Sequence, residues 1–175
     1  MRLLRRFSLL AVTVLVAGFG LTGCGDGGGD SQDDSARSTL DSDEKSVDAL
    51  VADLVPRLAK ALKADASGGR AFYRTCGMEP DLTGAEYTSN PQFGPSPDAG
   101  AAVDRVVTLL EGDGWSVDQP ANPEVVEGTL KQRSIRIQVG AHGTDVKVAG
   151  GCVDSSSDVA VEYGGRPAKD VPGVG

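Results

Sequence analysis

The chain has 175 residues, with 24 glycines and only 5% aromatic residues, which predicts one domain of ordinary size with a mainly aliphatic core. Acidic residues outnumber basic ones by 25 to 17, giving a formal net charge of −8. A surface this acidic repels polynucleotide backbones and anionic lipid headgroups. We therefore exclude nucleic acid as a partner.

The first 23 residues have the pattern of a cleavable signal peptide. Arg2, Arg5 and Arg6 form a positively charged start, and an apolar stretch follows from Phe7 to Leu21. That stretch is short and interrupted by glycine, which argues against a permanent membrane span. Loss of residues 1–23 removes three arginines and takes the formal charge from −8 to −11.

The segment Leu21-Thr22-Gly23-Cys24 resembles the bacterial lipobox, in which an apolar residue and two small residues precede a cysteine. The resemblance implies that Cys24 receives a diacylglyceryl group and anchors the protein on the extracytoplasmic side of the cell membrane. The alternative is a plain secretory signal followed by an unrelated cysteine. Arg5-Arg6 hints at twin-arginine export, but its flanks fit poorly, so we expect the general secretion route.

Residues 24–41 are rich in Gly, Asp and Ser, and Gly25–Ser35 contains no large apolar side chain that could offset the cost of ordering the backbone. We expect a disordered acidic tether that carries the lipidated Cys24 and lifts the domain off the membrane. The alternating Asp and Gly could also suggest a calcium loop, but their spacing fits no known calcium-binding repeat.

Two helices are predicted. The first covers about residues 43–64, where apolar residues recur on one helical face; they are Val47, Leu50, Val51, Leu54, Val55, Leu58 and Leu62. Pro56 should kink or divide this helix. The second starts at Ser96-Pro97-Asp98, with Ser96 as the cap, and ends near Gly112.

The remaining elements are predicted as strands and loops. A first strand covers Arg70–Cys76, and residues 77–95, punctuated by proline and glycine, form a long loop. A later run of strands follows: Trp115–Asp118, Pro123–Leu130, Ser134–Val139 and Asp145–Cys152, with a further short strand at Val159–Tyr163. The tail, residues 164–175, is expected to be disordered.

These elements predict a single α+β domain over residues 42–163. Its architecture would be a two-layer sandwich, with two helices packed on one face of an antiparallel sheet of four to five strands. Ile135, Ile137 and Val139 alternate with polar residues, as in a sheet with one wet face.

Two cysteines remain once Cys24 is assigned to the lipid. An exported domain faces an oxidising compartment, so Cys76 and Cys152 are expected to form a disulfide bond. The alternative is two separate buried thiols.

The layout also resembles the small lipoproteins of high-GC Gram-positive bacteria. The residues that carry the resemblance are Tyr73-Arg74-Thr75-Cys76-Gly77, Gly114-Trp115 and Gly151-Cys152-Val153, in addition to the lipobox and the acidic tether. Most members of this group have no known function. The resemblance therefore implies location and a disulfide, and it implies no activity.

No catalytic, metal or cofactor motif is predicted. His142, the single histidine, lies in a hairpin turn without partners at ligand spacing or near a nucleophile motif. Ser155-Ser156-Ser157 is typical of a solvated turn. Acidic residues are abundant, but no spacing selects one pair for glycosidase chemistry.

Four aromatic residues are candidates for a ligand groove, namely Tyr73, Tyr87, Phe93 and Trp115. The alternative is that they pin the long loop onto the sheet. The main hypothesis is a membrane-anchored binding or interaction domain for an envelope protein or small molecule. An extracellular hydrolase that uses carboxylates, and an inhibitor-like or structural envelope protein, are the alternatives.

Overall fold

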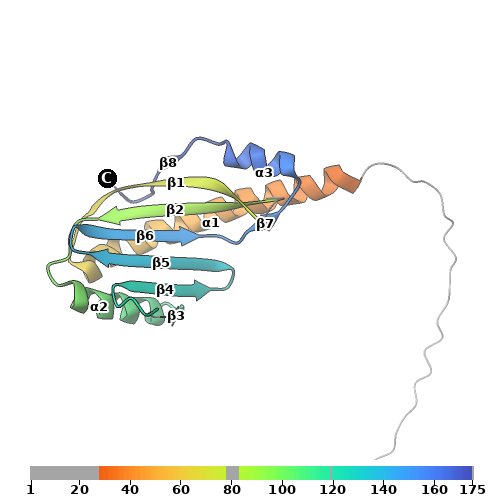
Figure 1. Ribbon diagram of the computed structural model, residues 1–175. Helices are drawn as coiled ribbons and strands as arrows, with labels where there is room; N and C mark the ends of the chain where they lie inside the picture. The colour runs from red at the N-terminus through yellow and green to blue at the C-terminus, as the bar shows by residue number, and fades with distance from the viewer. Residues whose placement is uncertain (1–27, 78–82, 119, 175) are drawn as a thin grey trace, which may run out of the picture.

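The computed structural model describes residues 28–77, 83–118 and 120–174, and the predicted signal peptide and Cys24 lie outside these residues. The fold is mixed α+β, as predicted, with three helices and an antiparallel sheet of eight strands (Figure 1). The structure therefore contains more helices and strands than the predicted two helices and four to five strands. The difference arises from residues 77–95 and from the C-terminal region.

Helix α1 (Gly28–Leu62) is 35 residues long and begins well before the predicted start at residue 43. The prediction of a disordered tether up to residue 41 is wrong from Gly28 onward. Ala36 and Leu40 continue the buried stripe, being 5% and 1% exposed. Long-range bonds also hold this part, because the Arg37 guanidinium pairs with Glu162 at 3.1 Å. Pro56 lies inside α1 without dividing it.

Strands β1 (Ala66–Cys76) and β2 (Gly84–Phe93) form a long antiparallel hairpin. The prediction of a loop over 77–95 is wrong for β2, although its segment 78–82 lies outside the described residues. Pro91 concealed this strand, because proline is rare in a central strand. Gly69 pairs with Pro91, and a Cβ at Gly69 would lie 2.9 Å from the Pro91 Cα, so only glycine fits there.

Helix α2 (Ala99–Gly112) was predicted, but its cap is Asp98 rather than Ser96. The Asp98 carboxylate accepts a hydrogen bond from the Ala101 amide, whereas the Ser96 hydroxyl donates to the Leu62 carbonyl at the end of α1. The meander that follows was also predicted, with small differences at its ends: β3 (Ser116–Asp118), β4 (Val125–Leu130), β5 (Arg133–Gly140) and β6 (Gly143–Ala149).

The C-terminal region departs most from the prediction. Residues predicted as a strand at 159–163 form helix α3 (Ser157–Gly164), which Ser156 caps. Two short strands flank it, β7 (Val153–Asp154) and β8 (Lys169–Asp170). The tail predicted to be disordered is ordered to residue 174, because β8 pairs with β1 and Val171 is buried beside Gly69.

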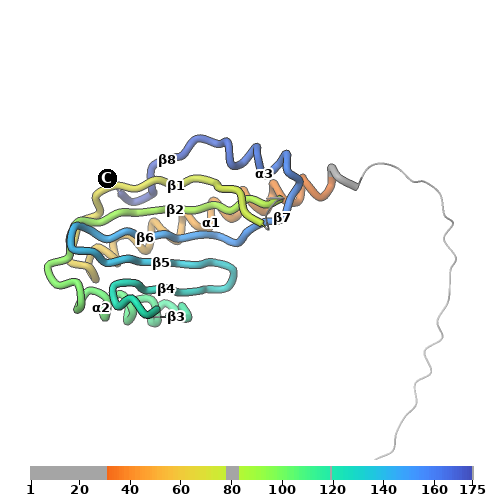
Figure 2. Tube along the Cα trace, viewed as in Figure 1, coloured from red at the N-terminus to blue at the C-terminus, as the bar shows by residue number. Residues whose placement is uncertain are grey.

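The strands lie in the order β3-β4-β5-β6-β2-β1-β8, and β7 pairs with the start of β2. Helix α1 crosses behind the central strands in the views of Figures 1 and 2, whereas α3 lies along the β1 border of the sheet and α2 lies beside β4. The opposite side of the sheet, toward the viewer, carries no helix of the described chain.

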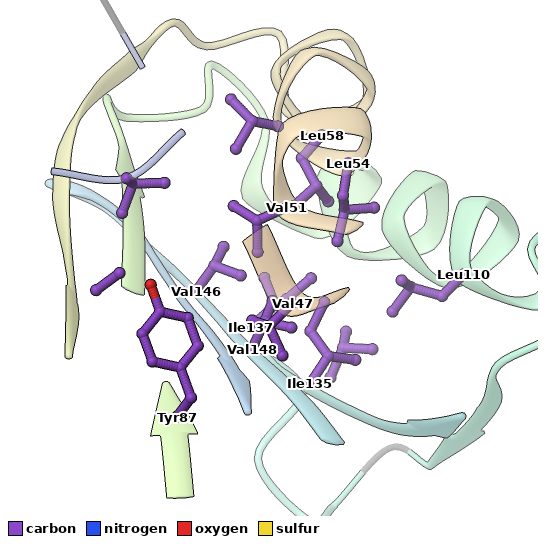
Figure 3. Packing of buried hydrophobic residues seen from close by; sticks show 14 of the residues in the cluster. Val47, Val51, Leu54, Leu58, Tyr87, Leu110, Ile135, Ile137, Val146 and Val148 are labelled. Carbon is purple, nitrogen blue, oxygen red and sulfur yellow. The ribbon is translucent and has the colours of Figure 1, made fainter. Parts of the chain in front are cut away.

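The core lies between α1, α2 and the covered face of the sheet. Figure 3 shows Val47, Val51 and Leu54 of α1 above Ile137 and Val148 of the sheet. One continuous cluster of buried residues runs from Leu40 to Val171. The side chains of Ile135, Ile137 and Val139 of β5 and of Val146 and Val148 of β6 belong to this cluster, which leaves the alternate residues of both strands on the other face.

Candidate ligand-binding face

The two cysteines predicted to pair are joined by a disulfide, with their Cα atoms 6.0 Å apart. Cys76 ends β1, and Cys152 directly precedes β7. A Cβ at Gly84 would lie 2.8 Å from the Cys152 Sγ, so the start of β2 passes close beneath the bond. The disulfide therefore joins the end of β1 to the start of β7 at one end of the sheet.

The four aromatic candidates for a groove do not gather in one place. Tyr73 and Tyr87 lie side by side on β1 and β2, with ring centroids 4.9 Å apart. Their further aromatic neighbour is Tyr163 of α3, whose ring lies 4.9 Å from that of Tyr73. Phe93 and Trp115 are separately buried in the core.

These three tyrosines, Tyr73, Tyr87 and Tyr163, form a tyrosine cluster that binds the acidic face of α1. Each hydroxyl donates a hydrogen bond to one carboxylate: Tyr163 to Asp41 at 2.9 Å, Tyr73 to Glu44 at 2.7 Å and Tyr87 to Asp48 at 2.8 Å. The three acids lie three and four residues apart, as one helical face requires. The tyrosines therefore anchor the sheet to α1.

Two cations of the C-terminal segment close this cluster. Arg166 pairs with Asp41 at 3.1 Å, and its guanidinium lies 3.6 Å from the Tyr163 ring centroid. Lys169 pairs with Glu44 and Asp48, each at 2.6 Å. The ordered tail is thus attached to α1 by charge as well as by its pairing with β1.

The pKa values in the cluster shift in the directions that this geometry requires. Burial, and then the hydrogen bond to Glu44, raises the pKa of Tyr73. Burial acts against the carboxylate of Glu44, but hydrogen bonds from Lys169 and Tyr73 lower its pKa overall. The same balance lowers the pKa of Asp41 through Tyr163 and Arg166. Neutral phenols and charged carboxylates are the stable forms, which suits a structural role.

The cavity beside the tyrosine cluster is small, at about 210 Å³, and it is lined by Tyr73, Tyr87, Arg166, Lys169 and their neighbours. Its polar groups already bind one another. We interpret this cluster as the fastening of the tail and of the N-terminal half of α1 rather than as a ligand site.

The open face of the sheet, on the side away from the helices, is polar. Along β5, the residues Ser134, Arg136 and Gln138 are exposed and alternate with the buried Ile135 and Ile137. Asp145 and Lys147 occupy the same side of β6, because they pair with Gln138 and Arg136.

At one level across this face, charged residues stand side by side on neighbouring strands. The pairs are Asp118 with Glu127, Glu127 with Arg136, and Arg136 with Lys147. The register of β2 with β6 then puts Asn90 opposite Lys147. We call these four charged residues together with Asn90 the charged row. Two acids are neighbours in it, and so are two bases, an order that costs folding stability.

Two hollows flank the middle of the charged row. The larger has a volume of about 510 Å³ and is lined by Asp118, Glu127, Arg136 and Lys147 together with the hydroxyls of Ser116, Thr129 and Ser134. The smaller, about 160 Å³, shares Arg136 and Lys147 and adds the amides of Asn90, Gln92 and Gln138. The two basic side chains therefore separate two polar depressions on one face.

The neighbouring acid Glu86 is the most buried carboxylate on this face, at 8% exposure. Arg74 binds it through two nitrogens, at 2.9 and 3.1 Å, and the Thr88 hydroxyl donates to it at 3.2 Å. Lys147 reaches it only at 4.0 Å. Glu86 is thus held by a guanidinium and does not face a second carboxylate, which is unlike the paired acids of a glycosidase.

The other residues considered for chemistry lie apart. His142 is exposed in the two-residue turn between β5 and β6. Ser156, predicted in a solvated turn, instead caps α3 and donates to Asp33 at 2.8 Å. In the described ranges, no group of three His, Cys, Asp or Glu residues is placed to hold a metal ion.

Sequence reasoning did not find the charged row. The alternation around Arg136 indicates one solvent-exposed strand face, but the predicted loop over residues 77–95 gives Asn90 and Glu86 no position in the sheet. The register that brings Arg136 opposite Lys147 is set by the two-residue turn at Ala141-His142, which the sequence does indicate.

Comparison with protein-family models, curated proteins and solved structures found no match to this chain. Among the described residues, no helix is both long and apolar enough to cross a membrane. The fold and the chemistry of the open face are therefore the basis for a functional proposal.

Proposed function

We propose that this protein is a lipoprotein anchored through Cys24 on the extracytoplasmic side of the cell membrane, where its domain binds a component of the envelope on the open face of the sheet. The pattern of residues 1–24 supports the anchor. The disulfide between Cys76 and Cys152 fits a domain exposed to an oxidising compartment.

One observation carries the binding part of the proposal. Helix α1 covers one face of the sheet, and the opposite face presents a hollow of about 510 Å³ with both bases and acids in its lining. Small-ligand sites are concave, and a small number of convergent polar groups fix the orientation of the ligand. The hydrolase alternative lacks such support, because the buried acid Glu86 is bound by Arg74.

The anchor is tested by fractionating bacteria that express the full chain. We expect the wild type in the membrane fraction, and mass spectrometry should find a diacylglyceryl group on Cys24. Cys24→Ala should leave the membrane fraction or stay unprocessed, whereas Thr22→Ala, which keeps a small residue before the cysteine, should remain anchored. A mature N-terminus beyond an unmodified Cys24 would contradict the proposal.

Binding by the open face is tested separately with the mature lipoprotein in detergent, sedimented with insoluble envelope material. Ser134→Trp places a bulky ring in the larger hollow and should reduce co-sedimentation several-fold. Lys60→Trp, on the exposed side of α1, is the matched control and should behave as the wild type. Equal sedimentation of both variants would remove the open face from the proposal.

A further inference from the structure

The charged row offers unused hydrogen-bonding capacity at its end on β6 and β2. With the residues that the structure describes, Lys147 makes one ion pair, a long one of 4.0 Å to Glu86, and Glu86 is already bound by Arg74. Asn90, which lines the smaller hollow, has a buried side-chain oxygen without a hydrogen-bond partner among the described residues. An amide oxygen only accepts hydrogen bonds, so a ligand hydroxyl could pair with it and an oxyanion could not.

Of the two bases of the row, only Arg136 has a close carboxylate partner in the part of the chain that the structure describes. Arg136 pairs with Glu127 on one side, but on the other side it stands directly opposite Lys147. Like charges opposite each other destabilise a sheet, and an anionic group placed between them would relieve the repulsion. These two bases therefore favour an oxyanion as the ligand, although the chain as a whole has a formal net charge of −8.

The lining around the bases selects the rest of the ligand. The larger hollow supplies hydroxyls from Ser116, Thr129 and Ser134, and carboxylates from Asp118 and Glu127. Hydroxyls can donate and accept, and carboxylates accept two hydrogen bonds, which matches the neighbouring hydroxyls of a sugar. Ser116 and Asp118 belong to the edge strand β3, but this strand has only three residues and offers little of the backbone pairing that an extended peptide would use.

From this juxtaposition we infer that the open face binds an acidic oligosaccharide, with a sugar carboxylate between Arg136 and Lys147 and sugar hydroxyls against Asp118 and Glu127. The inference rests on the proposed function only in using the same face. It does not depend on the lipid anchor.

The test uses the mature lipoprotein in detergent and isothermal titration calorimetry. The probe is an oligogalacturonate, and its fully methyl-esterified form is the matched control, since it keeps the sugar chain and loses the charge. We expect the acid to bind and the ester to bind at least about tenfold more weakly, as for the loss of one charge-assisted hydrogen bond. Equal affinities would overturn the inference.

Variants locate the site. Arg136→Gln and Lys147→Gln should each weaken binding about tenfold, and amide shifts in NMR spectra should concentrate in β3 to β6. Lys60→Gln removes the same charge from the outer side of α1 and should leave affinity unchanged. Because Lys147→Gln removes a like-charge neighbour, it should not lower the melting temperature. Wild-type affinity in both sheet variants would overturn the inference.

Two further outcomes would point to a different ligand. Equal binding of a poly-glutamate peptide would show that charge alone is recognised, and a peptide would then be the better candidate. A concentration-dependent dimer that Arg136→Gln dissociates would point to a second copy of the chain on this face. If every probe fails while Ser134→Trp still abolishes co-sedimentation, the ligand class is wrong and the binding function stands.

Discussion

Removal of the disulfide is the perturbation whose size the structure allows us to work out. Cys76 and Cys152 are separated by 76 residues, so the bond closes a long loop in the unfolded chain. In the chain-entropy relation, a loop of that length corresponds to about 4.5 kcal/mol at 25 °C. For a domain of this size, such a loss lowers the melting temperature by roughly 10–15 °C.

The assay is thermal unfolding followed by circular dichroism for Cys76→Ser, Cys152→Ser and the double variant, with and without a reductant. The three variants should melt at similar temperatures, because each removes the same bond. Reduced wild type should melt with them, while the reductant should leave the variants unchanged. Two titratable thiols in the native, unreduced protein, or a double variant much less stable than either single one, would refute the reasoning.

The remaining predictions concern α1 and the tyrosine cluster. Leu40→Ala should lower the free energy of unfolding by about 2–4 kcal/mol in urea denaturation, whereas Ser38→Ala, at an exposed position, should change it little. Equal effects of the two substitutions would show that residues up to 41 form a tether and do not pack on the domain. Because the folded pKa values of Asp41 and Glu44 are lowered from 3.8 and 4.5, stability is present above those values and should fall as the pH drops through the folded ones. Because the pKa of Tyr73 is raised from 10.0, stability is present below pH 10.0 and should fall as the pH rises beyond it. Midpoints of urea unfolding measured at a series of pH values check both the acidic and the alkaline loss of stability. Tyr73→Phe should make the alkaline loss smaller.

The sequence predicted the elements whose signals are local. Helix α2 and the meander from β3 to β6 follow from periodic apolar residues and short turns, and the disulfide follows from the two cysteines that remain once Cys24 is assigned to the predicted lipobox. Strand β2 was missed because Pro91 cannot donate a ladder hydrogen bond, which argues against a central strand. In the structure the pairing of β2 with β6 skips Asn90 and Pro91, and Gly69 lies opposite Pro91 on β1, both of which are properties of the register.

The first part of α1 and the tail were missed for a related reason. Residues 28–41 have little intrinsic tendency to form a helix, and contacts far along the chain hold them: Asp33 with Ser156, and Arg37 with Glu162. The charged row could not be predicted either, because it requires five strands in register, one of which was not recognised. Only the exposed side of β5 was visible from alternation.

The order of the strands affects how readily the protein self-associates at high local concentration. The sheet ends in β3, of three residues, on one side and in β8, of two residues, on the other. Long unpaired borders invite strands from neighbouring molecules, and short ones offer little for such pairing. Helix α3 packs against β1 beyond the reach of β8. A protein crowded onto a membrane surface, as proposed, would thereby resist self-association by strand addition.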